Sequence, residues 1–365
     1  MDKTINALGL MSGTSMDGID ASLIKSNGEK NINIIGNLYK QYDSELKNEL
    51  HELCKKINTH EDLEANIDEI KDIERKITIK HSEIVFDIQN KFNIKADIIG
   101  FHGQTIIHKP QDHYSIQIGN AKLLAQLSKI DIVSNFRKND IEHGGEGAPL
   151  TPIYHHNLKN NLNLHEPVLF LNIGGIANYT FSNKNYFCAR DVGPGNCLMD
   201  ELIKATKNLD YDKNGSLAAS GKVDKMLLNS IFEHEYYATK NKHSLDIKDF
   251  DINIVKGIQI EDALATLNYF SAKIIFENIK DDIDEDYKVI LCGGGRKNQT
   301  LVSNLEKLFN KKFFLIDDFK IDGDYIESQA FAYMSIRSLY KKNISFPDTT
   351  KVKKPITGGE LTNFN

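Results

Sequence analysis

The first forty residues carry a hydrophobic pattern that is typical of strands joined by a sharp turn. Residues 6–11 form a short apolar run, and residues 20–25 alternate between apolar and polar positions. Such alternation places one face of a strand in the core. The polar loop Ser12–Gly18 separates the two segments and predicts a hairpin, with residues 32–39 as a third strand.

A long amphipathic helix is predicted to follow this hairpin. From Ile67 onward, large apolar residues recur at three- and four-residue steps or their multiples, at Ile70, Ile73, Ile77, Ile84, Ile88 and Phe92. This spacing puts them on one face of a helix. Strands are then expected at residues 97–100, 115–118 and 131–134, with a helix at residues 121–127.

The same pattern starts again after the polar, glycine-dense residues 135–152. Residues 168–175 form a buried strand that ends in paired glycines, and residues 176–181 are its return strand. Later elements are expected as helices at 196–206, 258–278 and 324–340 and as a strand at 288–292. The repeated strand, glycine turn and hairpin predict two similar α/β domains that face a cleft.

We expect the first domain to cover residues 1–138 and to be joined by residues 345–365. The second domain is expected to cover residues 139–344. A hinge is predicted near residues 135–152, with a second crossing near the C-terminus. The last residues, 351–365, are interpreted as a solvated end.

Composition and charge narrow the class of protein. The 365 residues include 45 Lys and Arg against 51 Asp and Glu, a formal net charge of −6, which argues against binding to nucleic acid or an anionic membrane. No apolar run approaches the roughly 20 residues that span a bilayer. The four cysteines form no Cys-x-x-Cys pair, and no His-x-x-x-His spacing favours zinc. We expect a cytoplasmic protein and leave open whether it is a homodimer.

Glycines gather in six short segments, most of them at predicted strand ends. They are Gly9–Gly18, Phe101–Thr105, Gly144–Gly147, Asn172–Gly175, Asp191–Asn196 and Gly293–Arg296. One glycine indicates only a turn, but at such turns free backbone N–H groups converge and a phosphate can approach. The hydroxyl and carboxylate groups of the first loop suit a phosphoryl group and, through water, Mg²⁺. Neither a P-loop nor the dinucleotide-binding glycine pattern is present.

One short segment of the sequence resembles a different class of enzyme, the serine proteases. Residues 13–16 resemble the nucleophile segment of subtilisin-type proteases, and His102-Gly103 resembles their histidine motif. In those enzymes the order along the chain is Asp, His, Ser, whereas Ser15 precedes His102 here. Asp17 also stands where that family keeps a small residue. We therefore reject a protease.

The glycine segments together resemble the anhydro-N-acetylmuramic acid kinase family. The opening run Gly9-Leu-Met-Ser-Gly-Thr-Ser-Met-Asp-Gly-Ile-Asp20 looks like its signature. Further matches follow in order at Gly100–Thr105, Gln117–Asn120, Asn135–Asp140, Gly144–Leu150, Leu171–Asn178, Asp191–Asn196 and Cys292–Arg296. The resemblance implies the superfamily of acetate and sugar kinases, heat-shock chaperones and actin. It therefore implies an α/β fold of two similar ribonuclease H-like (actin-like ATPase) domains that flank a nucleotide and sugar cleft.

The resemblance also implies a reaction that uses ATP and Mg²⁺. Water attacks the anomeric carbon of 1,6-anhydro-N-acetylmuramic acid while O6 takes the γ-phosphoryl group. The products are N-acetylmuramic acid 6-phosphate and ADP, in the recycling of peptidoglycan. This chemistry requires a carboxylate base for the water and positioned donors for the phosphoryl group.

Two departures from the family pattern keep other functions open. Asn135 stands where the family usually has Asp, and Glu146 stands where it often has Gln. Both leave room for a kinase of the same superfamily that acts on another sugar or small carboxylate. A non-enzymatic ATP switch of the chaperone or actin kind is a further alternative, although no peptide-binding extension is evident.

Roles for individual residues follow from the resemblance. Asp191 is the expected base and Glu327 the second catalytic carboxylate. The nucleotide-binding set is Gly13, Thr14, Ser15, Met16, Asp17, Gly18, Ile19, Asp20, Gly174, Gly175, Gly293, Gly294 and Gly295, with Asp17 holding Mg²⁺ through water. The sugar-binding set is His102, Gln104, Arg137, Asn178, Gly193 and Asn196. Within it, Arg137 would pair with the lactyl carboxylate, because a guanidinium binds carboxylates in bidentate fashion.

Each of these side chains also has a purely structural interpretation. Asp191 fits a turn or the N-cap of a helix, and Asp324-x-x-Glu327 has the spacing of a capping box. Arg137 fits a surface ion pair. A histidine satisfied within the structure is commoner than a catalytic one, which applies to His102.

Overall fold

Two compact units make up the protein. The computed structural model describes residues 3–13, 15–232, 245 and 250–365. The first unit comprises Met1–Asn163 with Tyr325–Asn365, and the second comprises Leu164–Asp324. The chain thus crosses between units after residues 163 and 324, whereas the sequence places the boundaries after residues 138 and 344.

Residues 139–163 stay with the first unit because they are bonded to its C-terminal segment. Tyr154 in α6 (Pro152–Asn161) donates to Gln329 in α13 (Ile326–Leu339) at 2.7 Å. The backbone N–H of Glu146 donates to the carbonyl of Thr350 at 2.6 Å. The segment expected to act as a hinge, residues 135–152, therefore lies inside the first unit.

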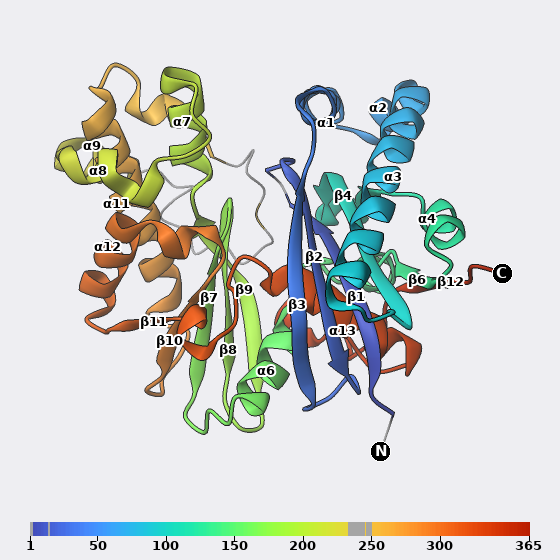
Figure 1. Cartoon of the computed structure of the whole chain (residues 1–365). Helices are drawn as coiled ribbons and strands as arrows, with labels where there is room; N and C mark the ends of the chain where they lie inside the picture. The colour runs from blue at the N-terminus through green and yellow to red at the C-terminus, as the bar shows by residue number, and fades with distance from the viewer. Residues whose placement is uncertain (1–2, 14, 233–244, 246–249) are drawn as a thin grey trace. The chain divides into compact units, whose positions relative to one another are not determined.

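The first unit is built on a seven-stranded mixed sheet (Figure 1). Its order is β12-β6-β4-β1-β2-β3, and β5 pairs with β4. The strands are β1 (Ile5–Ser12), β2 (Gly18–Ser26), β3 (Ile32–Gln41), β4 (Ile98–Lys109), β5 (Tyr114–Ile118), β6 (Asp131–Ser134) and β12 (Glu360–Thr362). β1, β2 and β3 form an antiparallel meander, and β4 and β6 continue the sheet parallel to β1.

The helices of this unit include the long one predicted from the isoleucine spacing. α3 (Ile67–Phe92) buries Ile70, Ile73, Ile77, Ile84 and Ile88, so that prediction is confirmed. The others are α1 (Ser44–Lys56), α2 (His60–Ala65), α4 (Ala121–Ser128), α5 (Lys138–Glu142), α6, α13 and α14 (Pro347–Thr350).

Two glycines of the family-like motifs serve helix packing and not a ligand. α13 crosses the sheet so closely that a Cβ at Gly9 would lie 1.9 Å from the Ser328 carbonyl oxygen. A Cβ at Gly100 would lie 2.2 Å from the Phe331 carbonyl oxygen. Gly9 and Gly100 thus let α13 seat on β1 and β4, where it presents Glu327 in its first turn.

The second unit repeats the strand order of the first. Its five-stranded sheet runs β11-β10-β7-β8-β9. β7 (Val168–Ile173), β8 (Ile176–Ser182) and β9 (Phe187–Pro194) form the antiparallel meander, and β10 (Lys288–Cys292) and β11 (Phe313–Leu315) continue parallel to β7. The predicted duplication of a ribonuclease H-like α/β domain is confirmed by this topology.

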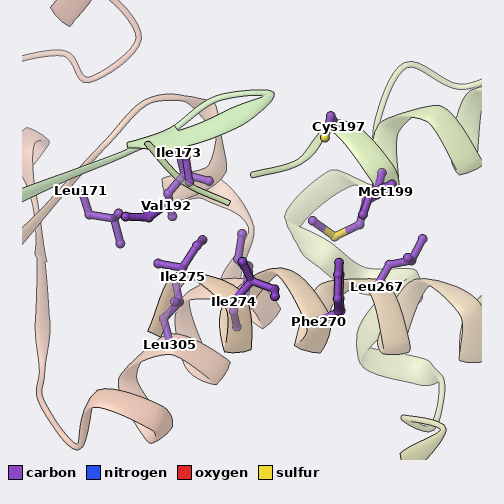
Figure 2. Close-up of a cluster of buried hydrophobic side chains, with 14 of the residues drawn as sticks. Leu171, Ile173, Val192, Cys197, Met199, Leu267, Phe270, Ile274, Ile275 and Leu305 are labelled. Atoms are coloured by element: carbon purple, nitrogen blue, oxygen red, sulfur yellow. The ribbon is translucent and has the colours of Figure 1, made fainter. Parts of the chain in front are cut away.

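Helices from several parts of the second unit cover its sheet. They are α7 (Cys197–Lys207), α8 (Ser216–Ser220), α9 (Lys225–Phe232), α11 (Ile260–Ile279) and α12 (Gln299–Phe309). Figure 2 shows Leu171 and Val192 on strands, with Phe270, Ile275 and Leu305 on helices, in one buried apolar cluster. This core fixes the strand ends that carry the second set of candidate residues.

The C-terminal segment is not a solvated end. Residues 360–362 pair antiparallel with β6, and Val352 is 1% exposed. The interpretation drawn from the lysines of residues 351–365 is therefore wrong, because apolar residues between them bury in the first unit. In the residues that the structure describes, no helix has the length and apolarity required to cross a bilayer.

Candidate active site

The loop between β1 and β2 is held by its own side chains. Ser12 Oγ donates to the Gly18 carbonyl at 2.9 Å and lies 2.9 Å from Tyr42 Oη. Ser15 Oγ donates to Asp17 Oδ1 at 2.5 Å, and the N–H of Met16 donates to the Gly13 carbonyl at 3.1 Å. The loop is thus a turn fixed by hydrogen bonds, with a carboxylate that suits a hydrated Mg²⁺.

Not every residue predicted in this loop can offer its side chain to a nucleotide. Ile19 is fully buried in the hydrophobic core, so only its backbone is available. Thr14 lies outside the described residues. Gln104 supports the loop from β4, because its Nε2 donates to the Gly13 carbonyl at 3.1 Å. The Gln104 Oε1 atom is buried and receives no hydrogen bond from the described part of the chain.

Tyr39 is a loop neighbour that the sequence did not reveal. It pairs with Asp20 across β2 and β3, and a Cβ at Gly18 would lie 2.6 Å from Tyr39 Oη. Burial, together with the charges of Asp17 and Asp20, raises the pKa of Tyr39 above its ordinary value. The phenol therefore stays protonated beside these two carboxylates. The hairpin register is the sequence signal that could have identified it.

Arg137 and His102 lie together in the first unit. β4 and β6 are parallel neighbours, so Arg137, three residues after β6, reaches His102 on β4. Arg137 Nε and Nη2 lie 3.2 and 3.0 Å from His102 Nε2, and His102 Nδ1 lies 2.9 Å from the Gly103 carbonyl oxygen. A guanidinium only donates, so Nε2 accepts and Nδ1 carries the hydrogen.

The pairing with Arg137 defines the protonation state of His102. Burial and the charge of Arg137 lower the pKa of His102 well below its ordinary value, so the ring is neutral. Both ring nitrogens are bonded within the protein. His102 thus supports Arg137, and neither nitrogen is available to a sugar in this arrangement.

Glu327 lies in the same unit, in the first turn of α13. The helix has Tyr325 as its N-cap without a side-chain cap bond, so the capping-box alternative for Glu327 does not hold. Burial raises the pKa of Glu327, and the charge of Arg137 acts to lower it. A partly buried carboxyl near a guanidinium is a reasonable acid–base group.

The two departures from the family pattern both have partners in the C-terminal segment. Asn135 Nδ2 donates to Glu360 Oε2 at 2.6 Å. Glu146 Oε1 lies 2.6 Å from Lys351 Nζ. An Asp at position 135 would face Glu360 with like charge, so Asn suits this chain.

Three glycine segments meet at one edge of the second sheet. β7, β9 and β10 end there, followed by Gly174-Gly175, Gly193–Asn196 and Gly293–Gly295. The N–H groups of Gly195 and Asn196 donate to the carbonyls of Gly175 and Gly174 at 2.8 and 2.9 Å. A Cβ at Gly295 would lie 2.3 Å from Ile173 Cγ2. The N-terminus of α7 opens at this edge, which suits an anionic ligand.

Asp191 lies within β9, beside these glycines. It is 7% exposed, and its Oδ2 accepts a hydrogen bond from the N–H of Leu245 at 2.8 Å. Asn178 is its cross-strand partner on β8. The N-cap of α7 is Asn196, so the N-cap alternative for Asp191 does not hold.

Arg296 locks the last glycine turn. Its side chain is 3% exposed and donates to Asp317 and Asp324 at 2.6 Å each, with Asp322 at 3.5 Å. It also donates to the Gly293 carbonyl at 2.9 Å. Three carboxylates thus fix the turn predicted to face adenosine.

No group of three or more His, Cys, Asp or Glu side chains suited to a metal occurs among the described residues. Asp17 and Asp20 provide carboxylate oxygens beside the β1–β2 loop. Mg²⁺ prefers such oxygen ligands and usually keeps several waters, so one or two carboxylates suffice. The donor set is therefore compatible with a water-mediated Mg²⁺.

Comparison with known proteins agrees with the resemblance of the motifs. A family model described as anhydro-N-acetylmuramic acid kinase matches residues 5–363. Proteins of that name from Pelagibacter ubique and Zymomonas mobilis are 47% and 39% identical, with alignments over 99% and 97% of this chain and 99% of each relative. A solved activator of 2-hydroxyisocaproyl-CoA dehydratase from Clostridium difficile aligns over 92% of this chain and 96% of its own, with 13% identity and a TM-score of 0.47. The chain belongs to the anhydro-N-acetylmuramic acid kinase family.

Proposed function

We propose that the protein is an ATP-dependent kinase that opens the 1,6-anhydro ring of 1,6-anhydro-N-acetylmuramic acid and phosphorylates O6. The products are N-acetylmuramic acid 6-phosphate and ADP. The observation that carries this proposal is the match along the whole chain, because residues 5–363 include both duplicated units and both sets of candidate residues. We further propose that it works in the cytoplasm, with its four cysteines as free thiols.

Asp191 is proposed as the base that takes a proton from the attacking water. Its burial in β9 and the hydrogen bond that it accepts from the N–H of Leu245 support a carboxylate held in one orientation. Asn178 is its cross-strand partner on β8, Gly193 follows it on β9, and Asn196 is the N-cap of α7; these three residues are proposed to contact the sugar. Glu327 is proposed as the second carboxyl group.

Nucleotide binding is proposed for the glycine turns and for the β1–β2 loop. The turns at Gly174 and Gly293 are held by hydrogen bonds from the N–H groups of these glycines to the carbonyls of Ile176 and Gly323, and neither glycine has a Cβ that would block a phosphate or a ribose. Asp17 is proposed to hold Mg²⁺ through water, with Tyr39 donating beside it. Bound Mg²⁺ supplies charge neutralisation at the transferring phosphoryl group.

Arg137 is proposed to bind the lactyl carboxylate of the sugar. Its guanidinium is oriented by His102 and Gly147, which is the fixed geometry that bidentate recognition requires. The contacts of Asn135 and Glu146 with the C-terminal segment account for these departures without a change of substrate. They favour the muramic sugar over the alternative of another sugar or small carboxylate.

Incubation with Mg-ATP and a panel of sugars tests the proposal. We expect phosphate transfer to the anhydro-muramic sugar, and its absence would refute the substrate assignment. In H₂¹⁸O, the label should appear at C1 of the product; unlabelled product would exclude attack by water. Slow ATP hydrolysis without stimulation by any sugar would instead favour an ATP switch.

A further inference from the structure

A continuous chain of hydrogen bonds runs from the C-terminal segment to Arg137. Thr350 Oγ1 donates to Asp140 Oδ2 at 2.5 Å, and Asp140 Oδ1 accepts from the N–H of Gly147 at 2.6 Å. The carbonyl of Gly147 then accepts from Arg137 Nη1 at 2.7 Å, and His102 Nε2 accepts from the other side of the guanidinium. All five residues belong to the first unit.

Gly147 is the central link of this chain. Its N–H is bonded to Asp140 and its carbonyl to Arg137, so a shift of Asp140 moves the acceptor that orients the guanidinium. Asp140 itself is 1% exposed, and a Cβ at Gly145 would lie 2.1 Å from its Oδ1. The loop is packed against this carboxylate, which leaves Gly147 little freedom to adjust.

Arg137 donates to a carbonyl and to a neutral imidazole. These two uncharged acceptors fix the direction of the guanidinium, while the charges of Asp140 and Glu327 act on it from nearby. By contrast, the buried carboxylate of the chain, Asp140, is bonded to a backbone N–H and to a hydroxyl.

We propose that Asp140 and His102 are positioning residues that aim Arg137 at the carboxylate of the substrate, so that they determine selectivity for a carboxylated anhydro-sugar. This inference rests on the proposed function. It assigns these residues to recognition of the acid group, separate from phosphoryl transfer. If Asp140 only fastened the C-terminal segment, its loss would weaken every ligand of the protein equally.

Two sugars separate these outcomes: 1,6-anhydro-N-acetylmuramic acid and 1,6-anhydro-N-acetylglucosamine, which lacks the lactyl ether. Their dissociation constants are measured by calorimetry on the full chain, together with the KM for ATP, kcat and the melting temperature. In the wild type we expect tighter binding of the acid sugar. Equal affinities for both sugars would overturn the proposal, whereas failure of the wild type to phosphorylate the acid sugar would refute the proposed function.

Asp140→Asn and His102→Leu should each weaken binding of the acid sugar by about tenfold or more, because a hydrogen bond to a charged group is changed. Affinity for the sugar without a carboxylate and KM for ATP should stay within about twofold of the wild-type values. The ratio of the dissociation constants of the two sugars should therefore approach one. His102→Gln keeps an acceptor at the position of Nε2 and should restore most of the selectivity.

Lys351→Ala is the matched control, because it removes the ion pair with Glu146 on the same loop and keeps the side chains that link Thr350, Asp140 and Arg137. This variant should leave the ratio of the dissociation constants of the two sugars unchanged. The sugar without a carboxylate can bind the wild type so weakly that only a lower limit for its dissociation constant is measured. In that case, a rise of the dissociation constant of the acid sugar toward this limit, with unchanged KM for ATP, supports the proposal. Parallel loss of affinity for both sugars, or for ATP, would overturn it.

Discussion

Arg137 and Arg296 lie beside candidate residues of the first and the second unit and are fixed by different partners. Arg137 in the first unit donates to the His102 ring and to the Gly147 carbonyl. Arg296 in the second unit donates to Asp317 and Asp324 and is 3% exposed. The two units have the same strand order, so the difference lies in the loops and not in the fold.

This difference in partners suggests different roles for the two arginines: binding of an anionic ligand for Arg137 and support of a loop for Arg296. Carboxylates around Arg296 cancel its charge, so it acts as a lock on the Gly293 turn. The uncharged acceptors His102 and Gly147 orient the Arg137 guanidinium through hydrogen bonds, and the charges of Asp140 and Glu327 act on it from nearby. Under the proposed roles, the arginine that recognises the acid group of the sugar belongs to the first unit, and the arginine that supports a nucleotide turn belongs to the second, together with the proposed base Asp191.

The most severe test of this division removes the proposed base. Asp191→Asn should lower kcat by about 10³-fold, because general-base catalysis typically contributes 10²- to 10⁴-fold. Affinity for ATP and the melting temperature should be nearly unchanged. Steady-state kinetics measures kcat, nucleotide titration measures the affinity for ATP, and thermal unfolding measures the melting temperature. Asp284→Asn, a substitution of an exposed aspartate, is the control. A kcat within about tenfold of the wild type would contradict the role of Asp191.

Arg137→Lys tests the proposed role of Arg137 in binding the sugar. The charge remains but the planar fork is lost, so kcat/KM for the muramic sugar should fall about 10- to 100-fold. ATP affinity should not change. The same substitution at Arg296 should instead lower stability, because three carboxylates there depend on the fork. If Arg296→Lys altered sugar selectivity, the division between the two arginines would fail.

Arg296→Met should lower the free energy of unfolding by about 2 kcal/mol. Loss of one partner of a buried ion pair typically costs 3–5 kcal/mol, and the cost here is smaller because the aspartate side chains are 36–48% exposed. Denaturant titration measures it. Lys297→Ala, which removes an exposed partner of Asp324, should change stability by less than about 0.5 kcal/mol. Equal effects of both variants would show that burial of Arg296 is irrelevant.

Local periodicity was sufficient to predict several elements of this fold but not α6, α8, α9, α12, β9 or β11. Three- and four-residue spacing predicted α3 from Ile67 to Phe92, and apolar runs predicted β1, β7 and β10. The paired glycines after β7 and β10 also lie at strand ends, as expected. Such features depend on residues close in sequence, which is why the sequence alone reveals them.

Contacts between distant residues could not be predicted in this way. His102 meets Arg137 only because β4 pairs with β6, and Asp140 meets Thr350 across 210 positions of sequence. Gly9 and Gly100 belong to motifs that resemble the family, and the structure shows that they make room for α13. Their role depends on a helix more than 200 residues further along the chain.

Buried carboxylates show a second contrast between the units. Burial raises the pKa of Asp140, and the hydrogen bonds that this carboxylate accepts act against the shift. Burial, and then the charges of Asp210 and Asp212, raise the pKa of Asp200 from 3.8 to about 7. The native state therefore binds more protons than the unfolded state between pH 3.8 and about 7, so this group lowers stability as pH rises through that window.

Asp200→Asn removes this group and should stabilise the protein at pH 8 by about 1–2 kcal/mol, a value reduced for its partial exposure. At pH 4 the carboxyl is protonated in the native state, so the variant and the wild type should differ by less than about 0.5 kcal/mol. Denaturant titrations at the two pH values measure the difference. Asp210→Asn should give part of the same gain, because it removes one of the two charges that face Asp200. A gain that did not depend on pH would show that packing, and not charge, sets the stability of this site in the second unit.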